Sequence, residues 1–119
     1  TDSENSLYIK ILICVNMIIR IVRMEFESDK LSDFQQIFDN SKAAIRAFPG
    51  CQYLALHQDA HNPNVRYTYS LWDSQACLDA YRNSELFGSV WPKTKRLFSA
   101  KPLAYSLHQL EEVSLLKKD

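Results

Sequence analysis

The sequence lacks the residue spacings that mark most metal, redox and nucleophilic sites. Its three cysteines form no CxxC pair, and its three histidines form no HExxH arrangement. These residues are Cys14, Cys51, Cys77, His57, His61 and His108. An odd set of scattered cysteines is typical of free, buried thiols in a reducing compartment. We therefore expect a cytoplasmic protein without a metal site.

The sequence also lacks an excess of either charge, because 14 basic residues balance 14 acidic ones. A nucleic-acid-binding protein normally carries basic residues gathered on one face. The only local basic cluster is Lys93, Lys95 and Arg96, followed by Lys101, and we interpret it as the solvated face of a helix. No nucleic-acid partner is therefore predicted. The length of 119 residues, 46% of them hydrophobic, fits one globular domain with one core.

An uninterrupted hydrophobic run of membrane-spanning length is missing as well. The nearest approach is Leu7–Phe26, which Lys10, Asn16, Arg20 and Arg23 interrupt. A charge at the centre of a bilayer costs about 2.5 to 3.5 kcal/mol even on a lenient scale. We therefore predict no membrane association.

The first 16 residues are open to three interpretations: a leader, an overlong start or an extra strand. A signal peptide is disfavoured because the start is acidic and no small-residue cleavage site follows. A clean strand pattern begins at Met17. We accordingly divide the chain into an N-terminal segment 1–16, a domain 17–113 and a C-terminal tail 114–119.

Hydrophobic periodicity within the domain predicts six elements in the order β-α-β-β-α-β. Strands are expected over 17–26, 51–57, 65–72 and 103–110, from β-branched and alternating residues. A first helix with an apolar stripe begins near Ser28-Asp29 or Ser32 and stops at Pro49-Gly50. A second helical region begins at Asp73 or Ser74 and a further piece at Ser84, where Pro92 either kinks the helix or restarts it.

This order predicts an α+β, ferredoxin-like fold with one antiparallel four-stranded sheet and helices on one face. The first, third and last strands carry apolar or aromatic residues on both sides. The face without helices would then expose a hydrophobic patch of the kind that marks an interface. We therefore expect a homodimer joined sheet to sheet.

Several short stretches resemble the antibiotic biosynthesis monooxygenase (ABM) domain family. They are Phe48-Pro49-Gly50-Cys51, Leu71-Trp72-Asp73-Ser74, Leu78-Asp79-Ala80-Tyr81, Asn83-Ser84-Glu85-Leu86-Phe87 and Lys101-Pro102-Leu103-Ala104. The resemblance implies a dimeric α+β barrel of ferredoxin-like subunits. It also implies one of several activities, among them quinone-forming oxygenation without metal or flavin, and haem degradation.

The haem-degrading members of that family use an Asn, a Trp and an axial His, at positions that correspond here to Arg23, Tyr81 and Trp91. Without the axial imidazole there is no iron ligand at that position, which disfavours haem as a cofactor. The resemblance therefore implies a reaction with no cofactor. Many other members carry a His where Tyr81 stands, so their usual acid-base group is replaced as well.

The resemblance and the aromatic residues together predict a pocket between helices and sheet for a flat ligand. We predict catalytic roles for Arg23, Tyr81 and His57 as hydrogen-bond donors and proton shuttle. The predicted substrate-binding residues are aromatic, namely Tyr67, Tyr69, Trp72 and Trp91. Five of these residues also have a structural alternative: Trp72 as a core plug, Tyr67 and Tyr69 as core or dimer-interface residues, Arg23 as an ion-pair partner of Glu25 or of a carboxylate from the other subunit of the dimer, and His57 as a hydrogen-bonded strand residue. For Tyr81 and Trp91, lining a cavity and a purely structural role both stay open.

Two functions follow from these features. The first is a cofactor-independent monooxygenase, or related modifier, of a small aromatic or quinone-like metabolite. The alternative is a non-catalytic dimeric domain that binds a small molecule or has a structural or stress-related role.

Overall fold

The computed structural model describes residues 16–115. Its elements are β1 (Ile18–Glu25), the 3-10 turn η1 (Ser28–Lys30), α2 (Leu31–Arg46), β2 (Cys51–Gln58), β3 (Val65–Trp72), α3 (Gln75–Arg82), α4 (Glu85–Lys95) and β4 (Leu103–Leu107). Nearly all of the predicted N-terminal segment and most of the predicted tail lie outside the described residues, so those boundaries stay predictions. No helix within 16–115 is long and apolar enough to cross a membrane.

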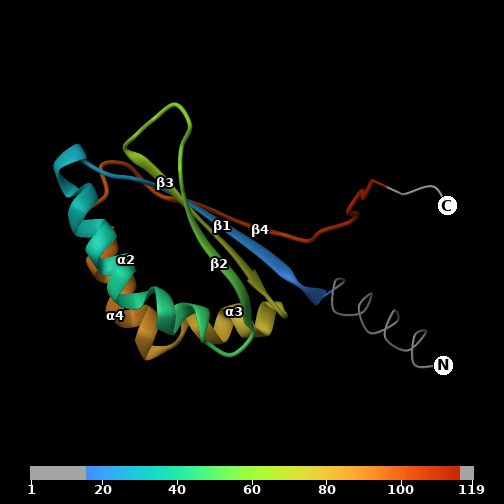
Figure 1. The fold of residues 1–119 in the computed structure, drawn as a ribbon. Helices are drawn as coiled ribbons and strands as arrows, with labels where there is room; N and C mark the ends of the chain where they lie inside the picture. The colour runs from blue at the N-terminus through green and yellow to red at the C-terminus, as the bar shows by residue number, and fades with distance from the viewer. Residues whose placement is uncertain (1–15, 116–119) are drawn as a thin grey trace, which may run out of the picture.

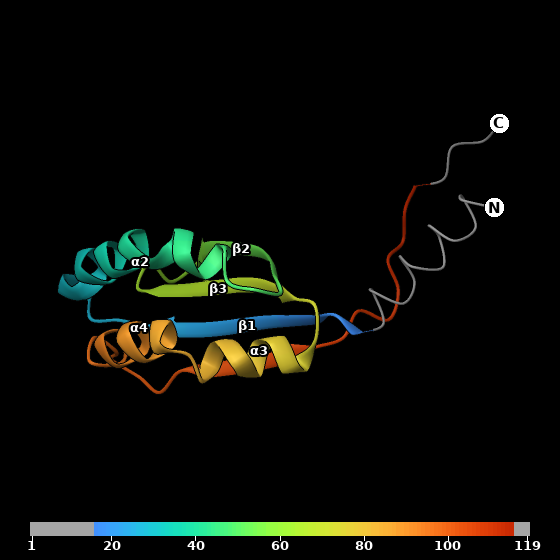
Figure 2. The same cartoon turned by 90° about the horizontal axis from the view of Figure 1, so that it is seen from below.

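The four strands form one antiparallel sheet in the order β2-β3-β1-β4. Helices α2, α3 and α4 all lie on one side of this sheet (Figure 1), with α2 beside α4 (Figure 2) and α3 in contact with β3. The predicted α+β, ferredoxin-like architecture is thus confirmed. We call the helix-covered side of the sheet the inner face and the other side the outer face.

The strand register sorts the side chains between the two faces. In an antiparallel pair, directly opposed residues share a face. The inner face carries Arg20 and Ser70 in one row and Val22 and Thr68 in the next. The rows of the outer face, each read from β2 to β4, are Tyr53, Leu71, Ile19 and Leu107; Ala55, Tyr69, Ile21 and Tyr105; and His57, Tyr67, Arg23 and Leu103.

Serine hydroxyls form the N-caps of the two shorter helices, α3 and α4, as the sequence predicts. The Ser74 hydroxyl accepts a hydrogen bond from the Cys77 backbone N–H at 3.2 Å, and the Ser84 hydroxyl accepts one from Phe87 at 3.2 Å. The cap expected for α2 near Ser28 or Ser32 is wrong, because a 3-10 turn precedes that helix and no side chain caps it. Helix α4 continues through Pro92 instead of restarting there.

The core lies between the inner face and the helices, in two clusters. One contains Trp72 and Leu78, which are 1% and 2% exposed, and the other contains Phe26 stacked on Phe34 with ring centroids 4.4 Å apart. Large aromatic side chains of this kind supply much of the apolar burial that stabilises a small domain. Trp72, Leu78 and Phe34 of these clusters thus fill part of the space between the sheet and the helices.

Gly50 allows the chain to turn closely beneath α3 after α2. Its φ of +89° lies in the region that favours glycine. A Cβ at this position would lie 2.6 Å from both Cβ and Sγ of Cys77. Only glycine therefore fits at this turn, as the predicted stop at Pro49-Gly50 requires.

Candidate functional site

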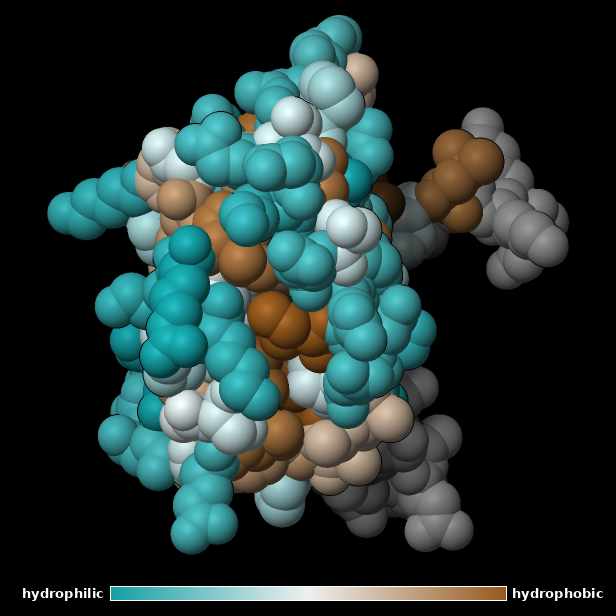
Figure 3. Space-filling view, turned by 90° about the vertical axis from the view of Figure 1, so that its left-hand side faces the viewer, coloured by the Kyte–Doolittle hydropathy of each residue, from teal (hydrophilic) through white to brown (hydrophobic). Residues whose placement is uncertain are grey.

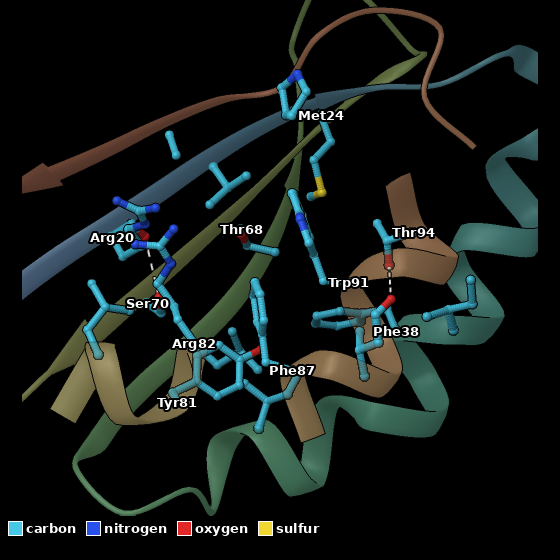
Figure 4. Close-up of a pocket in the computed structure, with 18 of the residues that line it drawn as sticks. Arg20, Met24, Phe38, Thr68, Ser70, Tyr81, Arg82, Phe87, Trp91 and Thr94 are labelled. Atoms are coloured by element: carbon cyan, nitrogen blue, oxygen red, sulfur yellow. Dashed lines mark hydrogen bonds between the residues drawn. The ribbon is translucent and has the colours of Figure 1, made fainter. Parts of the chain in front are cut away.

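A cavity of about 270 Å³ lies between the inner face and the helices. Every strand and every α-helix contributes to its lining, and the side chains of α3 and α4 close one side (Figure 4). The lining residues are Arg20, Val22, Met24, Phe34, Ile37, Phe38, Ile45, Leu54, Thr68, Ser70, Trp72, Leu78, Tyr81, Arg82, Phe87, Val90, Trp91, Thr94, Pro102 and Ala104. The volume is close to the lower end, about 300 Å³, of ligand-binding pockets, so the cavity suits a small molecule.

Four aromatic rings in mutual contact form one wall of the cavity, which we call the aromatic wall. Trp72 stacks on Tyr81 with centroids 4.9 Å apart and ring planes 24° apart. Tyr81 meets Phe87 edge to face at 5.3 Å, and Phe87 stacks on Trp91 at 5.7 Å. Such rings present flat π surfaces that favour a flat, conjugated ligand.

Burial in this wall changes the acidity of Tyr81. Burial first, and the nearby Cys51 thiol second, raise the pKa of the Tyr81 phenol to about 12. At neutral pH the phenol therefore stays protonated and can donate a hydrogen bond. The indole N–H of Trp72 already donates to the Ser70 hydroxyl at 3.0 Å, so Trp72 presents only its ring.

The cavity is apolar over most of its lining and reaches the surface on the helical side. Seen from that side, apolar atoms form a strip between polar side chains (Figure 3), in keeping with Ile37 and Phe38 on α2 and Val90 on α4 in the lining. Two cationic side chains, Arg20 and Arg82, also line the cavity (Figure 4). The lining contains no carboxylate and no imidazole among the described residues.

Three of the seven predicted site residues line this cavity, and four do not. Trp72, Tyr81 and Trp91 belong to the aromatic wall. The other four, Arg23, His57, Tyr67 and Tyr69, lie on the outer face, across the sheet from the cavity. Their alternation with inner-face residues along the strands explains the separation. The structure therefore brings the predicted residues together in two groups, one on each face.

The outer-face group is connected by polar contacts of its own. The Arg23 guanidinium lies 3.3 Å from the Glu25 carboxylate, and the proximity of Tyr67 and then of Glu25 raises the pKa of Arg23. The Tyr67 hydroxyl donates to the Asp59 carboxylate at 3.1 Å. Backbone N–H groups of the β2–β3 turn, together with this hydroxyl, lower the pKa of Asp59. The ion pair with Glu25 is the structural alternative that the sequence offers for Arg23.

Sequence reasoning missed three cavity residues with clear chemical character: Arg20, Arg82 and Phe87. Arg20 stands three positions before Arg23 on β1 and so lies on the opposite face, but this spacing does not tell which of the two faces the helices cover. Phe87 follows Tyr81 by six residues across the α3–α4 junction, which is not a spacing that places two residues on one helix face. Among the described residues no group of three His, Cys, Asp or Glu side chains is placed to hold a metal ion.

A ferredoxin-like α+β domain with an aromatic cavity between sheet and helices is the class that this fold and site define. A model of the antibiotic biosynthesis monooxygenase family matches residues 17–90, more than half of the chain. The chain therefore belongs to this family. Among curated proteins, no relative of similar sequence was found.

Solved structures share the fold at low sequence identity. A conserved protein from Methanosarcina mazei Go1 superposes with a TM-score of 0.77 at 14% identity, covering 81% of this chain and 95% of that one. Rv0793 from Mycobacterium tuberculosis superposes with a TM-score of 0.75 at 21% sequence identity, covering 82% of this chain and 99% of that one. A candidate antibiotic biosynthesis monooxygenase from Caulobacter crescentus CB15 superposes with a TM-score of 0.76 at 18% sequence identity, covering 87% of this chain and 99% of that one. These similarities establish the fold.

Proposed function

We propose that the chain is a cofactor-independent monooxygenase of a small aromatic or quinone-like metabolite. The observation that carries this proposal is the cavity of about 270 Å³ with its aromatic wall. A flat conjugated ligand gains stacking and apolar contact there. Membership of the antibiotic biosynthesis monooxygenase family supports oxygenation as the reaction.

The proposed reaction oxidises an activated CH₂ group of an anthrone-like substrate to a carbonyl. The substrate gives a proton to water at the mouth of the cavity and becomes a carbanion. The carbanion transfers its electrons to O₂ as a new C–O bond forms, and the resulting peroxide anion takes up a proton from water to give a hydroperoxide. Loss of water from the hydroperoxide leaves the quinone carbonyl. One oxygen atom enters the product and the other leaves as water, so the substrate itself supplies all the electrons.

Tyr81 has the chemical character needed to assist this reaction as a donor. Because its pKa is raised to about 12, the phenol stays protonated and can donate to the oxygen on which the carbanion charge is delocalised. The apolar lining would limit reprotonation of the carbanion by water. The catalytic roles predicted for Arg23 and His57 stay predictions, and on the outer face they require a ligand between the two sheets of a dimer.

Oxygen consumption by the purified protein tests the proposal. With anthrone and hydroquinone substrates we expect O₂ uptake and quinone absorbance to rise together. Tyr81→Phe keeps the ring but removes the donor, and we expect a rate loss on the order of 100-fold, as for an oxyanion donor. Tyr105→Phe makes the same change on the outer face and should leave the rate unchanged. If no substrate were consumed or bound, the proposal would fail.

A second candidate function is a non-catalytic dimeric domain that binds a small aromatic molecule. The absence of a carboxylate or imidazole among the described lining residues favours it, because such groups are the usual general bases. Binding of the same aromatic compounds without O₂ uptake would support this function over the first.

The outer face supports a homodimer joined sheet to sheet, which we propose as the assembly. Several large apolar side chains are exposed on it: Tyr53 (45%), Leu103 (46%), Tyr105 (50%) and Leu107 (44%). They continue across the sheet with partly buried Ile19, Ile21, Tyr69 and Leu71, and a second copy would remove this surface from water. In this assembly Tyr67 and Tyr69 would serve the interface.

A further inference from the structure

Two arginines that the proposed reaction does not use lie together at one end of the cavity. Arg20 projects from the inner face of β1, and Arg82 is the last residue of α3. Both side chains line the cavity, and Figure 4 shows them next to each other. The positive charge of Arg82, after the larger effect of burial, lowers the pKa of Arg20, which is consistent with this proximity.

Neither guanidinium is neutralised by an acidic group within residues 16–115. The ion pairs found there join Arg23 to Glu25 and Lys42 to Asp39. Arg20 donates to the Ser106 hydroxyl at 2.9 Å, which uses one of its five N–H donors. The two cations therefore keep most of their donors for another acceptor, although the outer-face arginine in the same strand has a carboxylate partner.

The position of the pair relative to the aromatic wall determines which acceptor fits. Arg82 directly follows Tyr81, and the Ser70 hydroxyl, which holds the Trp72 indole, donates at 3.4 Å to the backbone carbonyl of Arg20. Both guanidinium groups line the same cavity as Tyr81 (Figure 4), so a ligand held against the aromatic wall can have one edge beside them. Guanidinium groups prefer oxyanions, which they bind with paired, charge-assisted hydrogen bonds.

We propose that Arg20 and Arg82 form an anion-binding site that selects flat aromatic ligands carrying a carboxylate or phenolate oxygen at one edge. The inference deepens the proposed function, on which it rests for the position of the aromatic ring. It adds the charge of the ligand and the two residues that recognise it.

Matched pairs of ligands test the charge preference on the wild-type protein. Binding of 2-naphthoate is compared with its neutral isostere 2-naphthamide, and 4-nitrophenolate with 4-nitroanisole, by quenching of tryptophan fluorescence and by calorimetry. We expect at least one anion to bind about tenfold or more tightly than its neutral partner, and that preference to weaken in high salt. Preference in the naphthyl pair assigns a carboxylate, and preference in the nitrophenyl pair a phenolate.

Variants locate the preference. Arg20→Gln and Arg82→Gln should each reduce it to less than about threefold while leaving binding of the neutral ligand within twofold of wild type. The control is Arg96→Gln, which removes an exposed arginine outside the cavity lining and should leave the preference intact. Circular dichroism verifies folding, and the wild-type ligand pairs decide the question even if a variant fails to fold.

Each outcome separates this inference from the proposed function. Equal binding of both members of both pairs would overturn the anion site and leave the aromatic cavity as a binding site. A preference that survives Arg20→Gln and Arg82→Gln would also overturn it, because the anion would then bind elsewhere. No binding of any of the four compounds would overturn the proposed function and this inference with it.

Discussion

The inner and outer faces of the sheet carry the same kinds of side chain and use them differently. On the outer face, Arg23 is paired with Glu25, and Tyr67 donates to Asp59. On the inner face, Arg20 lies beside the aromatic wall with no acidic partner among the described residues. The difference teaches that the guanidinium of the outer-face Arg23 has its carboxylate partner within the chain, whereas the guanidinium of the inner-face Arg20 is left without one and is available to an anionic ligand.

The largest expected effect on this comparison is the loss of Trp72. Its ring is 1% exposed, so Trp72→Ala removes a core residue and part of the aromatic wall together. We expect the free energy of unfolding to fall by about 3 to 5 kcal/mol. Denaturant titration measures the change, at a dilution where the protein is monomeric. Tyr105→Ala, which truncates a half-exposed aromatic residue of the outer face, should cost less than half as much, and equal losses would contradict the comparison.

Next in size is the effect of a charge on the outer face. Tyr105→Glu would place two carboxylates, one from each copy, in the proposed dimer interface without partners. We expect the dimer dissociation constant to rise about 100-fold or more, equivalent to roughly 2.7 kcal/mol. Sedimentation velocity over a concentration series measures it. Lys95→Glu on the exposed side of α4 is the control, and identical behaviour of the two variants would argue against a sheet-to-sheet dimer.

The pH dependence of stability should distinguish an inner tyrosine from an outer one. The folded-state pKa of Tyr81 lies above its ordinary value of about 10, at about 12, so the folded state holds the phenolic proton more tightly than the unfolded state. The resulting stability is fully present below pH 10 and is lost as the pH rises towards 12. Between pH 10 and 12, we expect the free energy of unfolding of Tyr81→Phe to fall by roughly 2 to 3 kcal/mol less than that of the wild type. Tyr105→Phe should decline as wild type does, and coincident curves for all three proteins would refute the assignment.

The smallest effect is expected from the polar contacts of the outer face. Tyr67→Phe removes the hydroxyl that donates to Asp59 and keeps the ring. Because this contact is only part-buried and lies on the outer face, away from the cavity, the midpoint of thermal unfolding should fall by less than about 5 °C. Affinity for aromatic ligands should stay within twofold of wild type by fluorescence titration. A tenfold loss of affinity would instead place the ligand site on the outer face, in agreement with the sequence prediction for Tyr67.

Most of the fold could be predicted from local patterns in the sequence. Alternation gave β3 its bounds of Val65 and Trp72, and the hydroxyls of Ser74 and Ser84 mark the starts of α3 and α4. These signals are short-range, so they can be recognised without knowledge of the tertiary structure. The start of α2 was predicted less well, because a 3-10 turn takes the place of a side-chain cap there.

The site was harder to predict because both faces of β1 and β3 carry apolar and polar residues. Arg20 and Arg23 stand three positions apart on one strand and so lie on opposite faces, yet nothing local tells which face the helices cover. That choice depends on long-range packing of α2, α3 and α4. The helical residues Tyr81 and Trp91 do line the cavity, as predicted. The apolar side of a helix faces the sheet, and the cavity lies between the helices and the sheet, so a helical residue on that side also faces the cavity.

The double position of Trp72, in the core and in the cavity wall, constrains how this protein can evolve. A substitution there that reshapes the ligand space also removes a buried ring whose N–H is already bonded to Ser70, so the fold restricts the variants that can survive. Val90 and Trp91 on α4 are more exposed and line the same space without belonging to that cluster. Substitutions along α4 can therefore change the ligand preference at a smaller cost in stability than substitutions at the sheet end of the cavity.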